Sequence, residues 1–382
     1  MINEWRTCTL KEVIKTANTG LDAIKRAPIV DFNTGIKCLR IQDISQKKEF
    51  KDWGFCEVDK NNYTKYVVKK GDIYIARTGA SIGVNLLIKE NVNSVFNNGL
   101  IRLRINENIA DYLYVFYTLC TYEYEGHIEN ISGGTSTQPN MQINALLDYI
   151  FFLPPLPTQR AIAEILSSLD DKIDLLTRQN ATLEALVQTY FRQWFVEFET
   201  PLGRLDQIAQ ITMGQSPSGD SYNEEGRGTV FFQGRAEFGW RYPTIRLYTT
   251  EPQRMARKGD ILMSVRAPVG DINIATEDCC IGRGLASIHS DYPTFVLYAL
   301  KEQTEQLAIF DGEGTVFGSI TKEGLNGLDI HLPGINRVKE FETSFSILDK
   351  KIDNNTKQIQ ILQKLRDTLL PKLISGEVKV KQ

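Results

Sequence analysis

The hexapeptide LDDKID at residues 169–174 recurs as LDKKID at residues 348–353, 179 positions further along the chain. Upstream of each copy the similarity continues with a drifting offset, as in KGDI at 70–73 and again at 258–261. A constant offset indicates a rigid element whose length matters, whereas a drifting offset indicates loop-bearing domains that tolerate insertions. The sequence therefore predicts an internal duplication of one globular domain and one rigid element.

The rigid element has the hydrophobic spacing of a coiled-coil helix, with seam positions that step by four and three over about four heptads. In the first copy the seam is Ile162, Leu166, Leu169, Ile173, Leu176, Asn180, Leu183, Val187, Tyr190 and Trp194. In the second copy it is Phe341, Phe345, Leu348, Ile352, Asn355, Ile359, Leu362 and Leu369, with Arg366 as one break.

Two such helices in one chain need partners, and the simplest arrangement pairs them with each other. Because a globular segment lies between them, an antiparallel pair would place one domain at each end, with approximate two-fold internal symmetry. The polar seam residues Asn180 and Asn355 have two interpretations. Such an asparagine either fixes the register of the pair or sits in a partly solvated position.

The predicted fold class is α+β, with two mixed α/β domains separated by two long antiparallel coiled-coil helices. The expected boundaries are 1–152 and 201–331 for the domains, and 153–200 and 332–382 for the helical segments. Strands are predicted near 38–41, 72–76, 100–104, 259–265 and 285–289, helices near 111–122 and 293–306, and Gly- and Ser-rich loops at 130–138 and 311–319.

The composition is that of a globular protein, with 42% hydrophobic residues in 382 and a net charge of −3. That charge does not by itself favour nucleic-acid binding, which usually needs a basic surface. The start of the chain does not resemble a signal peptide, and no stretch is apolar enough to span a membrane, so we expect a cytoplasmic location. The six cysteines form no C-x-x-C pair and are expected to be reduced thiols.

The sequence offers little support for catalysis. GASIG at 79–83 fits the G-x-S-x-G pattern of a hydrolase, but a Ser81 nucleophile needs a following helix, and VNLLI at 84–88 predicts a strand. There is no G-x-x-x-x-G-K-[ST] phosphate loop and no complete G-x-G-x-x-G. His127, His289 and His331 are too scattered to predict a metal site.

Several segments together resemble the specificity subunits of Type I restriction-modification systems. They are LPPLPTQR at 153–160, ILSSLDDKID at 165–174, Trp194-Phe195, LLPKLISGE at 369–377, and GDIYIARTGASIG at 71–83. The resemblance covers essentially the whole chain in the order of that family. One departure is LPGINR at 332–337, which lacks the fuller Pro and Gln signature of the first copy.

The resemblance implies a non-catalytic subunit in which each α/β domain is a target-recognition domain for one half of a bipartite DNA site. The helices would set the gap between the halves. Two methyltransferase subunits would dock along the helices to form an adenine-methylating complex, and restriction subunits would add ATP-driven cleavage. S-adenosylmethionine, and ATP with Mg, are expected in those partners, with no cofactor or metal in this chain.

The methyltransferase subunits would also supply much of the DNA clamp, which reconciles the family with the net charge. Three alternatives stay open. One is a specificity subunit of a Type IIB-like restriction-modification enzyme. Another is a coiled-coil scaffold that binds only proteins, and the third is the hydrolase that uses Ser81.

Candidate base-reading residues come mainly from the polar and basic residue types that contact base edges, among which arginine on guanine is the commonest specific contact. They are Lys25, Arg26, Gln42, Arg77, Thr78, Ser81, Thr135, Ser136 and Thr137 in the first domain, and Ser216, Gln233, Arg235, Arg241, Tyr242 and Arg266 in the second. Arg77 and Arg266 are favoured because both follow the repeated Gly-Asp-Ile strand.

Candidate subunit-interface residues lie near the ends of the long helices. They are Tyr190, Trp194, Phe195, Leu369 and Leu373. For Trp194 and Phe195, together with Phe198, the alternative is that they anchor the helix to the domain that follows it.

Overall fold

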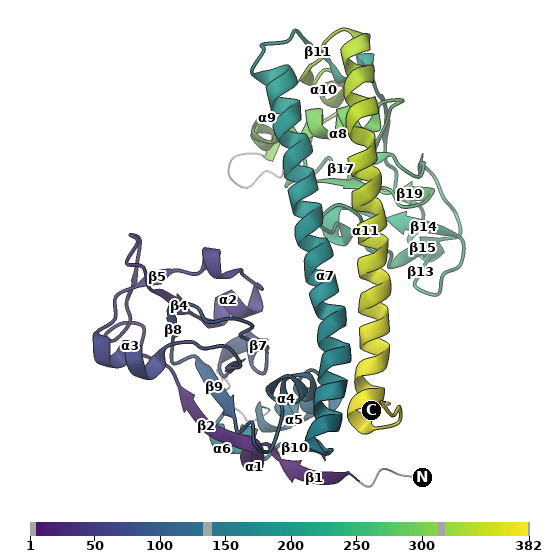
Figure 1. Cartoon of the computed structure of the whole chain (residues 1–382). Helices are drawn as coiled ribbons and strands as arrows, with labels where there is room; N and C mark the ends of the chain where they lie inside the picture. Colours follow the sequence, from purple (N-terminus) through teal and green to yellow (C-terminus); the bar gives the residue numbers. More distant parts are fainter. Residues whose placement is uncertain (1–4, 133–139, 312–317, 381–382) are drawn as a thin grey trace. The chain divides into compact units, whose positions relative to one another are not determined.

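The computed structural model describes residues 5–132, 140–311 and 318–380 (Figure 1). The chain forms two compact units, unit 1 (Met1–Leu175 with Gln358–Gln382) and unit 2 (Leu176–Lys357). Two long helices, α7 (Leu156–Phe191) and α11 (Ile335–Ser375), each contribute one part to each unit. The predicted α+β class with two domains and two long helices is confirmed. The boundaries at 152, 200 and 331 stay predictions.

The globular part of unit 1 contains three small sheets, with strand orders β1-β10, β2-β9-β6-β7 and β3-β5-β4-β8. Its strands are β1 (Arg6–Thr9), β2 (Ile14–Thr19), β3 (Ile29–Val30), β4 (Lys37–Leu39), β5 (Phe55–Cys56), β6 (Ile73–Ala76), β7 (Asn85–Leu87), β8 (Ser94–Phe96), β9 (Leu100–Ile105) and β10 (Ile150–Leu153). Its helices are α1 (Leu10–Val13), α2 (Ile41–Ser45), α3 (Lys60–Tyr66), α4 (Tyr112–Thr118), α5 (Tyr122–Ser132) and α6 (Ile143–Leu147).

The globular part of unit 2 follows the same plan, with strand orders β11-β21, β12-β20-β17-β18 and β13-β15-β14-β19-β16. Its strands are β11 (Leu202–Arg204), β12 (Gln210–Met213), β13 (Tyr222–Asn223), β14 (Thr229–Phe232), β15 (Leu247–Thr249), β16 (Met255–Ala256), β17 (Ile261–Ser264), β18 (Ile272–Ile274), β19 (Cys279–Ile281), β20 (Leu285–His289) and β21 (Asp329–His331). Its helices are α8 (Pro293–Glu302), α9 (Thr304–Ala308) and α10 (Lys322–Asn326).

The duplication read from the sequence is therefore present in the topology. In each unit two of the three sheets are entirely antiparallel, and the third contains a single parallel pair, β4 with β8 or β14 with β19. Strand β16 is an addition in unit 2. The offset drifts upstream because the equivalent strands are joined by loops of different length.

The repeated KGDI segment turns the chain into the central strand of the antiparallel sheet in both units. Gly71 and Gly259 have φ of +84° and +90°, which favours glycine. The buried carboxylates of Asp72 and Asp260 accept hydrogen bonds from the backbone N–H of Lys69 and of Arg257. The motif is thus a turn in which the aspartate carboxylate accepts a hydrogen bond from the backbone N–H three residues earlier.

Each unit buries two hydrophobic clusters. In unit 1 the larger cluster joins the β2-β9-β6-β7 sheet to α7 through Ile162 and Leu166, and to α11 through Leu370 and Leu373. In unit 2 the corresponding cluster is centred on aromatic side chains of both long helices and of α8. A smaller cluster underlies the β3-β5-β4-β8 sheet in unit 1 and its counterpart in unit 2.

Within each unit the two long helices run antiparallel. In unit 2, Asn180 pairs with Asn355, and further along α7 the Tyr190 ring lies 5.1 Å from the Phe345 ring. In unit 1, Arg366 Nη1 lies 2.8 Å from Asp170 Oδ1. Asn180 and Asn355 are 2% and 0% exposed, so the register interpretation is favoured and a partly solvated position is excluded.

The two helices also begin at equivalent positions, Leu156 and Ile335, which are 179 residues apart. In unit 1 the buried Gln159 accepts a hydrogen bond from the backbone N–H of Asp111, just before α4. In unit 2 Glu342 accepts from the backbone N–H of Phe295 in the first turn of α8. The second copy lacks the glutamine, and a glutamate one turn further along α11 bonds to α8 instead.

Three expectations about local structure were wrong. The predicted helix over 111–122 is two helices, α4 and α5, because the hydroxyls of Thr118 and Thr121 bond to backbone carbonyls at the break. Residues 130–132, expected in a loop, belong to α5. The second predicted helix, 293–306, is likewise divided, between α8 and α9 at Gln303.

Candidate nucleic-acid interface

In unit 1, three loops meet at one turn, residues 97–99, between β8 and β9. The backbone N–H of Leu21 donates to the carbonyl oxygen of Phe96, and that of Asn98 donates back to Leu21, both at 2.8 Å. The N–H of Asn97 donates to Leu39 at 3.0 Å, and the N–H of Arg77 donates to Gly99 at 3.0 Å. The segments that carry Lys25, Gln42 and Arg77 are thereby held around a single point.

Unit 2 has the same arrangement around residues 282–284, between β19 and β20. The N–H of Gly282 donates to Phe232 at 2.8 Å, and the N–H of Val265 donates to Gly284 at 3.0 Å. The N–H of Gln215 donates to Ile281 at 2.9 Å. The segments that carry Ser216, Gln233 and Arg266 therefore meet at one turn.

A glycine makes each of these meetings possible. A Cβ on Gly20 would lie 2.2 Å from the carbonyl oxygen of Phe96, and one on Gly214 would lie 2.2 Å from that of Gly282. Both distances are far below van der Waals contact, and both neighbours are backbone atoms. The two glycines are equivalent in the duplication, so the close approach is a shared feature of both units.

Arg77 and Arg266 both lie at their turns but do not occupy equivalent places. The backbone N–H of Arg77 and that of Val265 make the equivalent hydrogen bonds to their turns, so Val265 is the counterpart of Arg77. The counterpart of Arg266 is Thr78, because these two residues form the equivalent isolated β-bridges, to Ser319 and to Asn140. The half-buried Arg77 donates through Nε and Nη2 to Asn140 Oδ1 at 3.0 and 2.8 Å. Arg266 is exposed.

The other candidates of the first domain are placed around the same turn or nearby. Lys25, Arg26 and Gln42 are exposed, and Arg26 Nη2 donates to Asn62 Oδ1 at 2.6 Å. The Arg26 guanidinium also lowers the pKa of Tyr66, which lies beneath it. Thr78 and Ser81 are half-buried, with Ser81 in a short 3-10 turn. Thr135, Ser136 and Thr137 lie outside the described residues.

In the second domain, Gln233 and Arg235 are exposed, and Arg235 Nε lies 2.9 Å from Asp271 Oδ2. The hydroxyl of Ser216 accepts from the backbone N–H of Arg283 at 3.2 Å. Tyr242 is half-buried, and burial raises its pKa to about 12. These roles in base reading stay predictions.

Arg241 requires a correction, because its side chain is only 3% exposed. Its guanidinium is held by Glu184 Oε1 at 3.1 Å and Asp349 Oδ1 at 2.6 Å, one carboxylate from each long helix. A side chain buried between two carboxylates is not accessible to a base edge, even though Arg241 Nε itself has no hydrogen-bond partner. The sequence placed it correctly in a polar loop but could not show which way it points.

The structure adds two residues that the sequence did not single out, Asn98 and Arg283. Each is the exposed middle residue of the turn at which the three loops meet. The sequence pattern that could have identified them is an adjacent glycine, which follows Asn98 in NNG at 97–99 and flanks Arg283 on both sides in GRG at 282–284. Amide and guanidinium groups at such a position are suited to base edges or phosphates.

The candidate interface residues of the long helices divide into two groups. Phe195 and Leu373 are buried in the chain's own clusters, which contradicts a subunit interface and, for Phe195, favours the anchoring alternative. Trp194 is half-buried against Phe341 and Phe345. Leu369 is also half-buried, whereas Tyr190 and Phe198 are exposed.

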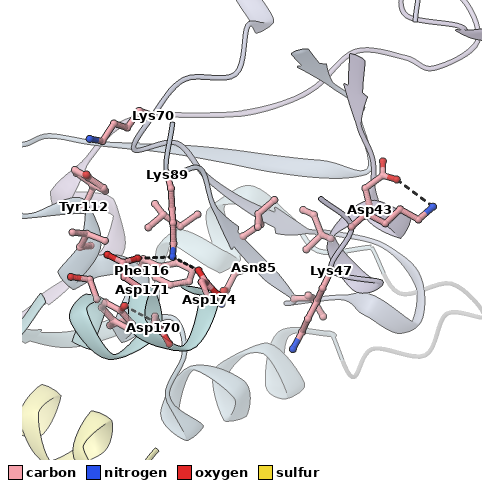
Figure 2. Close-up of a pocket in the computed structure, with 18 residues that line it drawn as sticks. Asp43, Lys47, Lys70, Asn85, Lys89, Tyr112, Phe116, Asp170, Asp171 and Asp174 are labelled. Atoms are coloured by element: carbon pink, nitrogen blue, oxygen red, sulfur yellow. Dashed lines mark hydrogen bonds and ion pairs between the residues drawn. The ribbon is translucent and has the colours of Figure 1, made fainter. Parts of the chain in front are cut away.

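Unit 1 also contains a cleft of about 550 Å³ (Figure 2). Lys47 and Lys48 of the β4–β5 loop line one side, and Asp170, Asp171 and Asp174 of α7 line another. Lys89 Nζ lies 2.9 Å from Asp171 Oδ1 and 2.7 Å from Asp174 Oδ2. All three of these side chains are more than half exposed, so the ion pairs are well solvated.

The described residues offer no support for the hydrolase alternative. Strand β7 follows Gly83, so the helix that a Ser81 nucleophile requires is absent there. Within 5–132, 140–311 and 318–380, no cluster of three His, Cys, Asp or Glu side chains could bind a metal. In those same ranges, every helix is too short or too polar to cross a lipid bilayer.

Comparison with known proteins gives consistent matches. The family described as the Type I restriction modification DNA specificity domain matches residues 2–185. The putative type I restriction enzyme MjaX specificity subunit of Methanocaldococcus jannaschii is 30% identical over an alignment of 406 residues. The alignment covers 99% of this chain and 94% of that protein. The HindI specificity subunit of Haemophilus influenzae is 26% identical, over 52% of this chain and 42% of that protein.

Among solved structures, the Type-I restriction-modification system S subunit from M. genitalium superposes with a TM-score of 0.67. The match covers 98% of this chain and 96% of that chain, at 19% sequence identity. At that identity the likeness establishes the fold alone.

Proposed function

The chain belongs to the specificity subunits of Type I restriction-modification systems, and from that premise we propose that its two α/β domains each read one half of a bipartite DNA site. The observation that carries the proposal is the duplicated turn. Loops from three parts of each domain meet at 97–99 and at 282–284, and both meeting points carry polar or basic side chains. One reader on each copy of a duplicated scaffold is what a two-part site requires.

We assign base-edge contacts to two residues in each domain. In unit 1 they are the exposed Asn98 and the nearby Arg77, and in unit 2 they are the exposed Arg283 and the nearby Arg266. Guanidinium and amide side chains form bidentate pairs with guanine and adenine in the major groove. Lys25, Arg26 and Gln42 in unit 1, and Gln233 and Arg235 in unit 2, would position the loops on phosphates or add base contacts.

The long helices would set the gap between the half-sites and carry two methyltransferase subunits. Large apolar side chains on both helices are exposed, which supports a docking role. They are Leu175, Leu186 and Tyr190 on α7, and Ile335, Ile347, Ile361 and Leu365 on α11. With Phe195 and Leu373 buried, Tyr190 stays an interface candidate and the other exposed side chains join it.

In this proposal the chemistry belongs to the partners. The methyltransferase subunits would bind S-adenosylmethionine and methylate adenine, and restriction subunits, where present, would use ATP with Mg. The assembly would act on cytoplasmic DNA. The net charge of −3 fits this division, because the partners would supply much of the phosphate contact.

The test is enrichment of bound sequences from a pool of random duplex DNA, using this chain co-produced with its methyltransferase subunit. The proposal predicts two short conserved blocks separated by a fixed number of unconserved positions. Binding without sequence preference would instead favour the protein-only scaffold. A single uninterrupted block would contradict one reader per domain.

A further inference from the structure

Arg241 lies in the loop that connects β14 to β15 (residues 233–246), which also carries Gln233 and Arg235. Apart from a three-residue 3-10 turn at Arg235–Glu237, the loop is irregular. A loop of this length without regular structure needs fixed points if its side chains are to be held in one place. Its position therefore depends on how it is attached.

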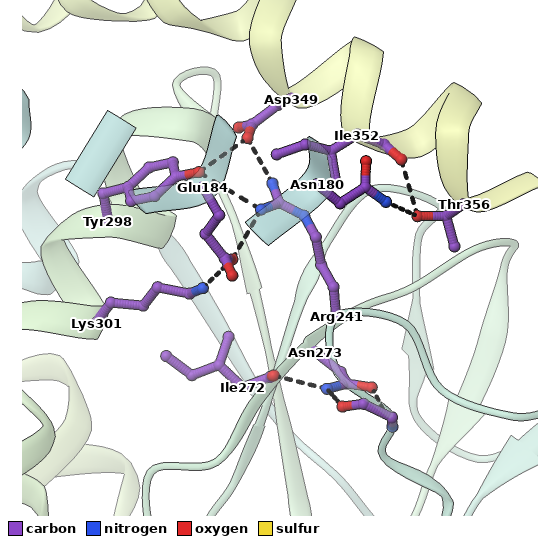
Figure 3. A network of polar contacts seen from close by, with 11 residues as sticks. Asn180, Glu184, Arg241, Ile272, Asn273, Tyr298, Lys301, Asp349, Ile352 and Thr356 are labelled. Atoms are coloured by element: carbon purple, nitrogen blue, oxygen red, sulfur yellow. Dashed lines mark hydrogen bonds and ion pairs between the residues drawn. The ribbon is translucent and has the colours of Figure 1, made fainter. Parts of the chain in front are cut away.

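The side chain of Arg241 attaches the loop to both long helices at once (Figure 3). Its guanidinium bridges Glu184 of α7 and Asp349 of α11. Around it, Lys301 of α8 pairs with Glu184, and the Tyr298 hydroxyl donates to Asp349 at 3.2 Å. Guanidinium is suited to such a bridge because its donors form a rigid planar fork.

The backbone of the same loop is fixed separately to strand β18. The carbonyl of Arg241 accepts from the N–H of Ile274 at 2.9 Å, and Gly239 exchanges two hydrogen bonds with the side chain of Asn273, both at 3.0 Å. The backbone thus fixes the loop to the sheet, and the Arg241 side chain fixes it to the helices.

The equivalent loop of unit 1, residues 40–54 between β4 and β5, is held differently. Trp53 Nε1 donates to the carbonyl of Lys48 at 3.1 Å, and Lys37 Nζ donates to the carbonyls of Lys51 and Trp53. These contacts tie the loop to itself and to β4. The 550 Å³ cleft separates this loop from α7 in unit 1. In unit 2, by contrast, Arg241 connects the equivalent loop to the long helices.

We propose that Arg241 is a positioning residue, which fixes the β14–β15 loop to both long helices and thereby sets base selectivity at the half-site read by unit 2. The effect on base selectivity rests on the proposed function, whereas the attachment of the loop to the helices does not. The two readers then differ in kind. Unit 2 presents a loop fastened to the helices, and unit 1 presents a loop that is braced within its own domain.

The first arm of the test is hydrogen–deuterium exchange on the full chain without DNA. In Arg241→Met, peptides that cover 233–246 should exchange faster, and peptides that cover 40–54 should not change. Arg227→Met is the matched control, because it removes the same charge from an exposed pair with Glu225 in the same unit. Unchanged exchange of 233–246 in Arg241→Met would overturn the attachment, whatever the chain binds.

The second arm is selection from random duplex DNA with the methyltransferase-bound complex. Arg241→Met should lower discrimination at one half-site by roughly tenfold, comparable to a mismatched base pair. The other half-site and the gap should not change. Arg241→Lys, which keeps the charge but lacks the fork, should give an intermediate loss. An equal loss at both halves, or weaker binding with unaltered preference, would show that Arg241 is merely structural.

If Arg241→Met does not fold, Asp349→Asn serves in its place, because it keeps an oxygen acceptor and removes one charge. The same two readouts then apply, with smaller expected changes in the same peptides and at the same half-site. A wild-type complex without any sequence preference would refute the proposed function, while the exchange arm would still decide the attachment.

Discussion

The side-chain amide of Asn355 donates a hydrogen bond to the amide oxygen of Asn180 at 2.9 Å, across the seam between the two long helices, and also donates to Gln179 Oε1 at 2.9 Å. Asn180 in turn donates to the hydroxyl of Thr356 at 3.2 Å. In the duplication, the counterparts of Asn180 and Asn355 are Ile359 and Leu176. The pair is therefore peculiar to the α7–α11 combination, and a helix paired with a second copy of itself would not reproduce it.

Asn180→Leu should destabilise the chain by about 1–3 kcal/mol, because it removes one of the two acceptors of the buried Asn355 amide. Asn180→Leu combined with Asn355→Leu should recover most of that loss, since replacing both polar groups with apolar ones is close to neutral. Urea unfolding of the single and double variants measures this. Additive losses in the double variant would contradict the pairing.

Arg77→Ala should weaken discrimination at one half-site only, and Arg266→Ala at the other half-site only, because the two residues lie in different units. The expected loss is roughly 1–3 kcal/mol at the affected base pairs. Competition binding with DNA altered in one half-site at a time separates the two effects. For either variant, equal losses at both halves would refute the assignment.

Stability should depend on pH through Glu342. Burial raises the pKa of this carboxyl above its ordinary value of 4.5. The folded chain then holds the proton more tightly than the unfolded chain, so stability decreases as pH rises from that ordinary value through the raised pKa. Glu342→Gln removes this dependence and keeps an acceptor for Phe295. The melting temperature of this variant relative to that of wild type should rise as the pH increases above the ordinary value of 4.5, and a difference that does not change with pH would contradict the burial effect.

Thiol chemistry should be suppressed in the folded state. Five of the six free cysteines are buried, and only Cys120 is exposed. Burial raises the pKa of Cys8 to about 11 and that of Cys279 to about 12, so both remain protonated at pH 8. A chromogenic disulfide reagent should therefore modify at most one thiol per chain before denaturant is added. Modification of several thiols in the native protein would contradict the observed burial.

The sequence predicted the fold correctly wherever a residue pattern is compatible with only one kind of structure. The 179-residue offset predicted two equivalent helices, and the four-and-three spacing predicted the seam that Asn180 and Asn355 occupy. Alternating and buried apolar runs located strands such as β6, β17 and β20. Strand and helix breaks that depend on side chains bonding to the backbone, as at Thr118 and Thr121, were not visible from periodicity.

The candidate site was less predictable, because its residues come together through backbone contacts between distant loops. The meeting of Leu21, Leu39 and Arg77 at the turn 97–99 depends on tertiary structure, and only Gly20 hints at it. Arg241 shows the limit most clearly. An arginine in a polar loop looks the same in sequence whether it faces solvent or bridges two partly buried carboxylates.

The central claim is that this chain gives a DNA-modifying complex a two-part target. The most direct measurement is the map of adenine methylation on genomic DNA from cells that produce this chain with its methyltransferase subunit. The account predicts methylation confined to one motif, with two specific blocks and a fixed gap. Methylation without sequence preference, or a motif unchanged when this chain is omitted, would contradict it.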